Sequence, residues 1–244
     1  MFTVLAAIAA VLVTVLAVRM IAARGDRKVP DQARPGTVLL VPGYGGGTGA
    51  LDELAGAVRR AGRTATVVGL PGDGTGDLRR QADALDDAVA AALRTAASVD
   101  LVGYSAGGVV VRLWVQDHDG AHKARRVVTL GSPHHGAAIA AAGGAALPGA
   151  CPLACQQLAP GSSLLAGLRS PVPQPPVWMS IWTEQDQTVT PPDSARLDGA
   201  LDVDIQQSCP GRPVSHAQLP TDDYVTDLVL AALGPDPMEP PQPC

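Results

Sequence analysis

The chain has 244 residues, of which 46% are hydrophobic and only 3% aromatic, and its formal net charge at pH 7 is −5. This length and apolar content predict one large α/β core with little chain left for a second domain. Because the chain is acidic and has no basic cluster, nucleic acid is excluded as the expected partner, and a neutral or apolar small-molecule substrate is favoured.

The N-terminus is an apolar run from Phe2 to Val18, followed by basic residues between Arg19 and Lys28. The run is at the short limit of a membrane-spanning helix and also fits the apolar part of a secretory signal. Residues 1–24 are therefore predicted to be an anchor or signal segment. An uncleaved anchor is favoured because no clear cleavage site follows. The positive-inside rule would then hold the rest of the chain in the cytoplasm.

Cysteine usage points the other way. The chain has four cysteines, all outside the apolar segment: Cys151, Cys155, Cys209 and Cys244. An even number of cysteines behind an export-like N-terminus favours disulfides and an extracytoplasmic location, although their pairing stays open. A zinc site is not expected, because Cys151 and Cys155 have the wrong spacing for a zinc knuckle. We expect a secreted or membrane-anchored monomer of bacterial type, with membrane contact through the N-terminal segment.

Strand and helix patterns alternate after a polar linker at 25–35. Unbroken apolar runs predict buried strands, and one-sided apolar faces predict the helices between them. The expected strands are 37–41, 64–68, 100–104, 126–130, 177–182 and 203–205, with helices at 51–58 and 78–93, another after Ser105, and a last one capped by Thr221. This order predicts a mostly parallel, doubly wound sheet with helices on both faces. We place the catalytic domain at 36–234, before a proline-rich tail at 235–244.

One insertion, between His134 and Pro176, has few strand signals and is the only stretch long enough to cover a site. The expectation is a small cap or none. Its Leu164, Leu165 and Leu168 have helical spacing, which favours a small packed helix over an apolar surface offered to a substrate.

The central motif is Gly103-Tyr104-Ser105-Ala106-Gly107, at the end of an apolar strand and the start of an apolar helix. In such a strand-turn-helix, glycines on both sides allow a tight turn that exposes the serine hydroxyl. The alternative is an ordinary glycine-rich turn. The presence of the other parts of a serine site, in the right chain order, decides between them.

A serine nucleophile needs a base, and the chain offers five histidines: His118, His122, His134, His135 and His216. Only His216 follows every plausible acid-bearing strand, so it is the predicted base. His118 and His122 lie in a charged segment and are expected to be solvated. A metal site at His134 and His135 is not expected, because adjacent residues on an extended loop diverge and no acidic partner is near.

The predicted acid is Asp186, which follows the strand at 177–182 and has a short side chain with little entropy to lose. Glu184 is the fallback, and a merely solvated loop carboxylate is the alternative to both. Asp193 and Asp198 lie further into the next loop or helix.

The oxyanion hole requires two backbone donors, one after the nucleophile and one after the first core strand. These are the N–H groups of Ala106 and Tyr44. The glycines at 43 and 45–47 would let the loop backbone approach closely, although they also fit a flexible turn without a ligand. A phosphate-binding loop is excluded because no Gly-Lys-Ser/Thr ending is present.

Taken together, these stretches resemble the α/β-hydrolases, and more narrowly the small bacterial class 2 lipases. The matching motifs are Val41-Pro-Gly-Tyr-Gly-Gly46, Val102-Gly-Tyr-Ser-Ala-Gly-Gly108, Val127-Val-Thr-Leu-Gly-Ser-Pro-His-His-Gly136, Asp186-x-x-Val189-x-Pro191 and Val214-Ser-His216. Pro42 stands where many lipases have histidine, which affects the contacts of that loop but not its donors.

The resemblance implies a lipase or carboxylesterase that cleaves small-molecule or lipid esters through an acyl-enzyme on Ser105. Asp186 and His216 would complete the triad, with no cofactor and no metal. A serine acyltransferase or thioesterase would use the same triad and stays open as the alternative. A membrane-tethered binding module without catalysis is disfavoured because every triad position is filled.

Overall fold

The computed structural model describes residues 28–146 and 151–244. The predicted anchor or signal segment at 1–24 lies outside these residues, as does the start of the linker. Within the described part, no helix is both long enough and apolar enough to cross a bilayer.

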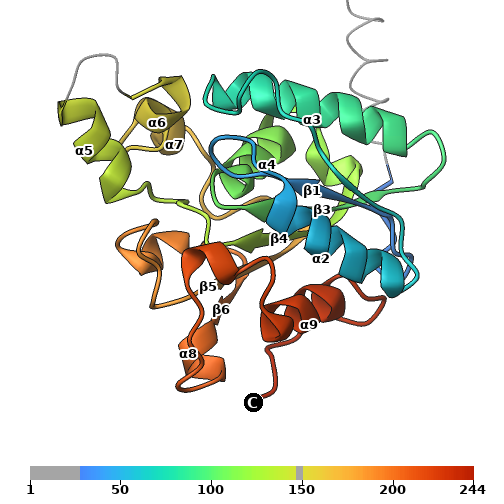
Figure 1. Ribbon diagram of the computed structural model, residues 1–244. Coiled ribbons are helices and arrows are strands. Elements are labelled where there is room, and N and C mark those ends of the chain that lie inside the picture. The colour runs from blue at the N-terminus through green and yellow to red at the C-terminus, as the bar shows by residue number, and fades with distance from the viewer. Residues whose placement is uncertain (1–27, 147–150) are drawn as a thin grey trace, which may run out of the picture.

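Six strands form one sheet in which every neighbouring pair is parallel, in the order β2-β1-β3-β4-β5-β6 (Figure 1). The strands are β1 (Thr37–Val41), β2 (Ala65–Val67), β3 (Val99–Tyr104), β4 (Ala124–Leu130), β5 (Val177–Trp182) and β6 (Leu201–Asp204). The chain moves outward from β1 to β2, then returns to place β3 on the other side of β1. Parallel sheets bind ligands at such a reversal, beyond the carboxyl ends of the strands.

Helices cover both faces of the sheet, as the alternating pattern predicts. The helices α3 (Leu78–Ala92) and α4 (Ala106–Asp117) pack on one face, and α2 (Gly49–Arg60) and α9 (Asp223–Ala232) pack on the other (Figure 1). Alternate strand residues point to opposite cores, so Leu101 contributes to the α3 and α4 side while Val102 contributes to the α2 and α9 side. This alternation is the period of two of a strand that is buried on both faces.

Two expectations near the C-terminal end were wrong in detail. The strand expected at 203–205 ends at Asp204, and Ile205 begins the short helix α8 (Ile205–Ser208) because the Asp204 side chain caps it by accepting from two backbone amides. The cap of α9 is Asp222 rather than Thr221, since the Asp222 carboxylate accepts from the Val225 amide at 3.1 Å. The Thr221 hydroxyl instead donates to the Gln218 carbonyl.

The insertion after β4 contains three short helices, α5 (Ala138–Ala146), α6 (Leu153–Gln157) and α7 (Ser163–Ala166), grouped at one corner of the molecule (Figure 1). A disulfide joins Cys151 to Cys155 at the start of α6. Leu164 and Leu168 are buried in the core on the α3 and α4 side, so they belong to packed structure rather than to an exposed surface.

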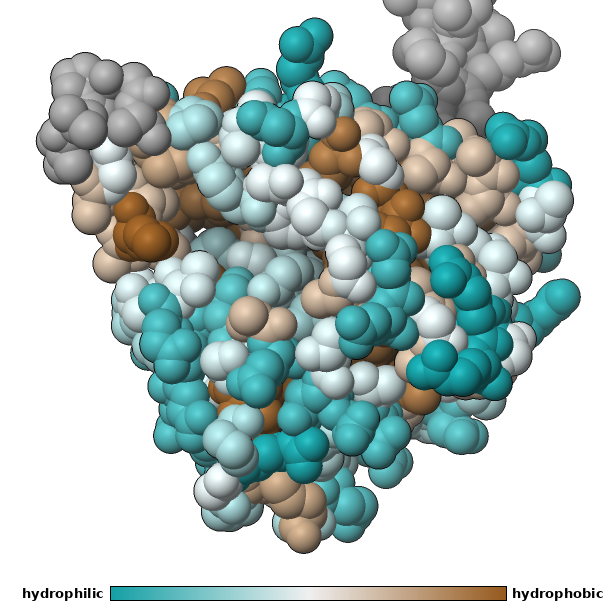
Figure 2. All heavy atoms as spheres, viewed as in Figure 1, coloured by the Kyte–Doolittle hydropathy of each residue, from teal (hydrophilic) through white to brown (hydrophobic). Residues whose placement is uncertain are grey.

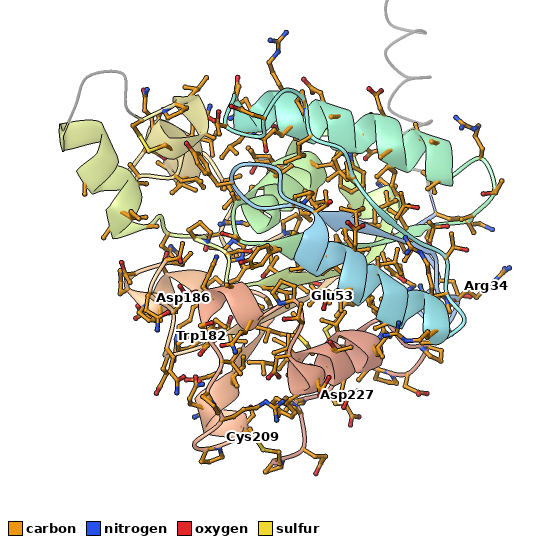
Figure 3. All side chains as sticks on the ribbon, in the orientation of Figure 1. Arg34, Glu53, Trp182, Asp186, Cys209 and Asp227 are labelled. Carbon is orange, nitrogen blue, oxygen red and sulfur yellow. A yellow bond between two sulfur atoms is a disulfide. The ribbon has the colours of Figure 1, made fainter. Side chains whose placement is uncertain are left out.

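The second disulfide joins Cys209, just after α8, to the terminal Cys244. Figure 3 shows Cys209 at the far end of the molecule from α3, near the C-terminus marked in Figure 1. The proline-rich tail is therefore tied to the domain.

His118 is less solvated than expected, because its ring lies 3.2 Å from Asp83 and 3.6 Å from Asp86.

A buried ion cluster lies at the start of β3. Both oxygens of Asp100 accept from the Arg125 guanidinium, at 2.9 and 2.8 Å, and one also accepts from Arg63 at 2.6 Å. Arg125 donates further to the carbonyls of Leu233 and Gln32. The cluster thus joins the N-terminal linker and the end of α9 to the middle of the sheet.

Candidate active site

Ser105 lies in the tight turn between β3 and α4, and its backbone has φ 53° and ψ −125°. A positive φ is costly for a residue with a side chain, by about 1–3 kcal/mol, and persists only where the surroundings enforce it. The glycines on both sides of Ser105 let the surrounding backbone pack closely enough to hold this conformation. A Cβ on Gly103 would lie 2.5 Å from the Gly108 Cα, and one on Gly107 would lie 2.2 Å from the Val41 carbonyl oxygen.

The structure brings Ser105, His216 and Asp186 into one chain of contacts. The His216 Nε2 lies 3.0 Å from the Ser105 Oγ, and its Nδ1 lies 2.6 Å from the Asp186 Oδ2. The other carboxylate oxygen of Asp186 accepts from the amides of Thr188 and Val189 at 2.8 and 2.7 Å. Figure 3 shows Asp186 just beyond Trp182, the last residue of β5. One oxygen of the acid is therefore fixed by backbone and the other is left for the imidazole.

His216 begins a short 3-10 helix, η3 (His216–Gln218), which is held by a capping box between Ser215 and Gln218. The Tyr104 hydroxyl donates to the His216 carbonyl at 3.2 Å, and the two rings lie 5.2 Å apart. Burial raises the pKa of Tyr104 to about 12, assisted by the negative charge of Asp186, so the phenol stays a donor. In the sequence motif Tyr104 is a variable position between the glycine and the serine. Its contact with His216, 112 positions away, could not be predicted from the neighbouring sequence.

Gly131 at the end of β4 is a second contributor that sequence reasoning missed. Its φ is +54°, and a Cβ there would lie 3.1 Å from the His216 Nδ1 and 2.5 Å from the Leu219 side chain. Only a residue without a side chain lets this loop pass behind the histidine.

The two residues predicted to supply the oxyanion donors, Tyr44 and Ala106, line the same pocket as Ser105. Ala106 is the first residue of α4, where helix amides have no intrahelical acceptor and the helix dipole favours negative charge. Tyr44 lies in the loop after β1, which packs so closely that a Cβ on Gly43 would be 3.0 Å from the Ser105 Cβ. Among the described residues, neither amide donates a hydrogen bond to an acceptor. This is consistent with the predicted donor role, which stays a prediction.

Ser105 opens into a pocket of about 320 Å³ with an almost entirely apolar lining. One wall comes from the loop after β1 and the start of α4, and the other from α5 and α6. The lining residues are Tyr44, Ser105, Ala106, Pro133, Ala137, Ile139, Ala140, Gly143, Cys155, Leu158, Thr188 and Val189. Figure 2 shows hydrophobic surface at the upper left, around the hollow beside the position of α5 in Figure 1.

The other candidate carboxylates are not brought to the histidine. Glu184, Asp193 and Asp198 are exposed, whereas Asp186 is buried. The described residues contain no group of three or more potential metal ligands.

His134 is buried and takes part in a hydrogen-bond chain behind the site. The Thr129 hydroxyl donates to Ser180 at 2.9 Å, and Ser180 donates to the Ala195 carbonyl, so Thr129 is left to accept from the His134 Nε2 at 3.1 Å. The His134 carbonyl accepts from the buried Arg112. Burial, with a further contribution from the Arg112 cation, holds the pKa of His134 well below its usual value of 6.5.

This neutral histidine predicts a pH dependence of stability. As the pH falls through about 6.5, the unfolded chain protonates His134 and the folded chain does not, so the free energy of unfolding decreases until the folded pKa is reached. In His134→Gln, whose amide can still donate to Thr129, that contribution is absent. We expect its free energy of unfolding to fall less steeply than wild type between about pH 6.5 and pH 5, by up to about 1.4 kcal/mol per pH unit. Urea unfolding across this range measures the slopes, and equal slopes would contradict the assignment.

Comparison with known proteins agrees with this architecture. Residues 65–164 match the palmitoyl protein thioesterase family. This stretch is less than half of the chain, and it contains Ser105 but ends before Asp186 and His216. No curated protein sequence matches the chain.

Among solved structures, the chain is similar to the mature lipase BlEst2 of Bacillus licheniformis, with a TM-score of 0.68 and 19% identity over 84% of this chain and 94% of that one. It is similar to Aspergillus fumigatus lipase B, with a TM-score of 0.67 and 17% identity over 82% of this chain, but spans only 52% of that protein. An extracellular α/β-hydrolase from a Paenibacillus species matches with a TM-score of 0.54 and 16% identity, over 83% of this chain and all of that one.

These likenesses, at identities below 20%, establish the fold. The chain has the α/β-hydrolase fold that the motifs predict, and it resembles bacterial lipases.

Proposed function

We propose that the chain is a serine hydrolase that cleaves carboxylic esters, with lipid esters as the favoured substrates, and that residues 36–234 are its catalytic domain. The observation that carries the proposal is the contact chain from Asp186 through His216 to Ser105, whose hydroxyl faces an apolar pocket. A nucleophile, a base and an orienting acid in this geometry are the parts required for acyl transfer.

In the proposed reaction, the Ser105 Oγ attacks the ester carbonyl carbon and its proton passes to the His216 Nε2. The negative charge that develops on the carbonyl oxygen is stabilised by the Tyr44 and Ala106 amides, and Asp186 stabilises the imidazolium and holds its Nδ1 proton. The C–O bond to the alcohol then breaks, and His216 protonates the leaving oxygen. Water, deprotonated by His216, attacks the acyl-enzyme and releases the acid, restoring the Ser105 hydroxyl. Every step uses groups of this chain and water.

A fluorophosphonate probe tests the proposal directly, because it reacts only with an activated serine. We expect one covalent adduct on wild type, at Ser105 by peptide mass spectrometry, together with hydrolysis of p-nitrophenyl esters. Denatured protein is the control. A native, folded protein that neither reacts with the probe nor hydrolyses any of these esters would exclude the proposed function.

A thioesterase is the second candidate, because the matched family is described by that activity. The same triad would act on a thioester, with His216 protonating a leaving thiol rather than a leaving alcohol as the bond from the acyl carbon breaks. Comparing kcat/KM for an S-acyl peptide with that for the corresponding O-acyl peptide, at one acyl length, discriminates between the two. A large preference for the thioester would favour the second candidate.

We also propose that the chain works outside the cytoplasm, because both of its disulfides need an oxidising compartment to persist. Alkylating protein isolated from its native cells with a thiol reagent should leave all four cysteines unmodified until a reductant is added. Four modified cysteines before reduction would contradict this location.

A further inference from the structure

The far wall of the pocket is built by α5 and by the disulfide at the start of α6. Ala140 and Gly143 of α5 line the pocket together with Cys155. A Cβ on Gly143 would lie 3.4 Å from the Cys155 Sγ, and both sulfur atoms lie 3.8 Å from the Ala140 carbonyl oxygen. The helix and the disulfide are therefore in contact and form one surface.

Helix α5 leads away from the catalytic residues. At its start, the Ala138 amide donates to the Thr190 carbonyl, in the loop that carries Asp186. Gly143 follows five residues later, which is about 7.5 Å along a helix axis. A chain that lies along α5 from Ser105 therefore passes Ala137 and Ala140 before it reaches Gly143.

The glycine at 143 is not required by the backbone. It lies inside a helix, where glycine is less favourable than alanine, and its φ is not in the left-handed region. A Cβ there would meet the disulfide at an ordinary van der Waals distance. Because this contact leaves no room for a larger side chain between α5 and the disulfide, such a side chain would have to enter the pocket that Gly143 and Cys155 both line.

We propose that Gly143 and the Cys151–Cys155 disulfide set the length of the acyl chain that the pocket accepts, so that the substrates are esters of medium or long fatty acids. The inference rests on the proposed function, because the chain must be attached to the carbonyl that Ser105 attacks. The apolar lining fits a hydrocarbon chain, which gains free energy for each methylene removed from water.

The test compares p-nitrophenyl butyrate with p-nitrophenyl octanoate, which differ only in the acyl chain. In Gly143→Leu we expect the ratio of kcat/KM for octanoate to that for butyrate to fall by at least about tenfold, since each methylene excluded from an apolar pocket costs about 10-fold or more. Gly143→Ala should lower the same ratio in the same direction but less than Gly143→Leu, because it adds one carbon rather than four, and it keeps the test available if the leucine variant fails to fold. Ala142→Leu is the matched control, because Ala142 is exposed on the same helix and its ratio should not change.

The disulfide provides an independent arm. Replacing both Cys151 and Cys155 by serine should change the chain-length ratio, because the wall is no longer held against α5. Replacing both Cys209 and Cys244 by serine removes the other disulfide, which does not line the pocket, and should leave the ratio as in wild type.

Labelling of Ser105 by a small fluorophosphonate separates the two hypotheses. If the wild type neither reacts with the probe nor hydrolyses the esters, the proposed function fails. If the Gly143 variants react with the probe but keep the wild-type ratio, or if Ala142→Leu shifts the ratio as much as Gly143→Leu, the proposed function survives and the inference about chain length is overturned.

Discussion

Ser105→Ala and His216→Ala should each lower kcat for ester hydrolysis by about 10⁶-fold, and the double variant should be no worse than either alone. The residues act as one unit, because a serine hydroxyl without a base is a weak nucleophile and a base without the serine has nothing to activate. Asp186→Asn should cost about 10⁴-fold, since an amide in place of the carboxylate favours the wrong tautomer of His216. Steady-state hydrolysis of p-nitrophenyl butyrate measures all four variants.

Glu184→Gln is the matched control for the acid. Its side chain is exposed and lies two residues from Asp186, so neutralising it should leave kcat within about twofold of wild type, as expected for a surface charge outside the site. If Glu184→Gln cost as much as Asp186→Asn, the orienting acid would be wrongly assigned. If His216→Ala kept wild-type activity, the whole triad would be wrongly assigned.

Asp100→Ala should lower the free energy of unfolding by about 3–5 kcal/mol, the usual cost of leaving a buried charge without its partner. Asp100 and Arg125 are both fully buried, and the bidentate pair between them is the only carboxylate contact that the described structure gives Arg125. The variant also removes the carboxylate contact of Arg63, which keeps its bonds to two backbone carbonyls. It loosens the carbonyls of the linker and of the end of α9 that Arg125 holds. Urea unfolding followed by circular dichroism measures the loss.

The exposed pair of Arg79 and Asp117 is the control for this effect, with side chains 49% and 34% exposed. Solvent screens such a pair, so Asp117→Ala should cost no more than about 1 kcal/mol. A similar loss in both variants would mean that burial of the Asp100 cluster contributes nothing beyond an ordinary surface ion pair.

The local pattern of apolar and polar residues was sufficient to predict most of the strands and helices. Apolar runs predict the strands at 37–41 and 177–182 with their observed bounds and the other strands within two residues, because strands buried on both faces are mainly apolar. The expected β6 is displaced at both ends, because it is an edge strand whose Leu201 and Asp204 are half-buried and its apolar run carries a weaker signal. Thr221 and Asp222 are both good capping residues, and only the path of the chain decided which side chain faces the amides of α9.

The sequence by itself predicted three parts of the site: the glycine and serine spacing around Ser105, the order Ser, Asp, His, and the glycine-rich loop at Tyr44. Each is a local requirement of a strand end or a tight turn. The sequence alone thus determined the fold class and the candidate residues for the chemistry. Only the tertiary structure decided four other features. These are the cysteine pairing, the contact of Tyr104 with His216, the passage of Gly131 behind the imidazole and the lining of the pocket. Each of these joins segments far apart in the chain, and such contacts depend on how helices pack on the sheet rather than on any periodicity along it.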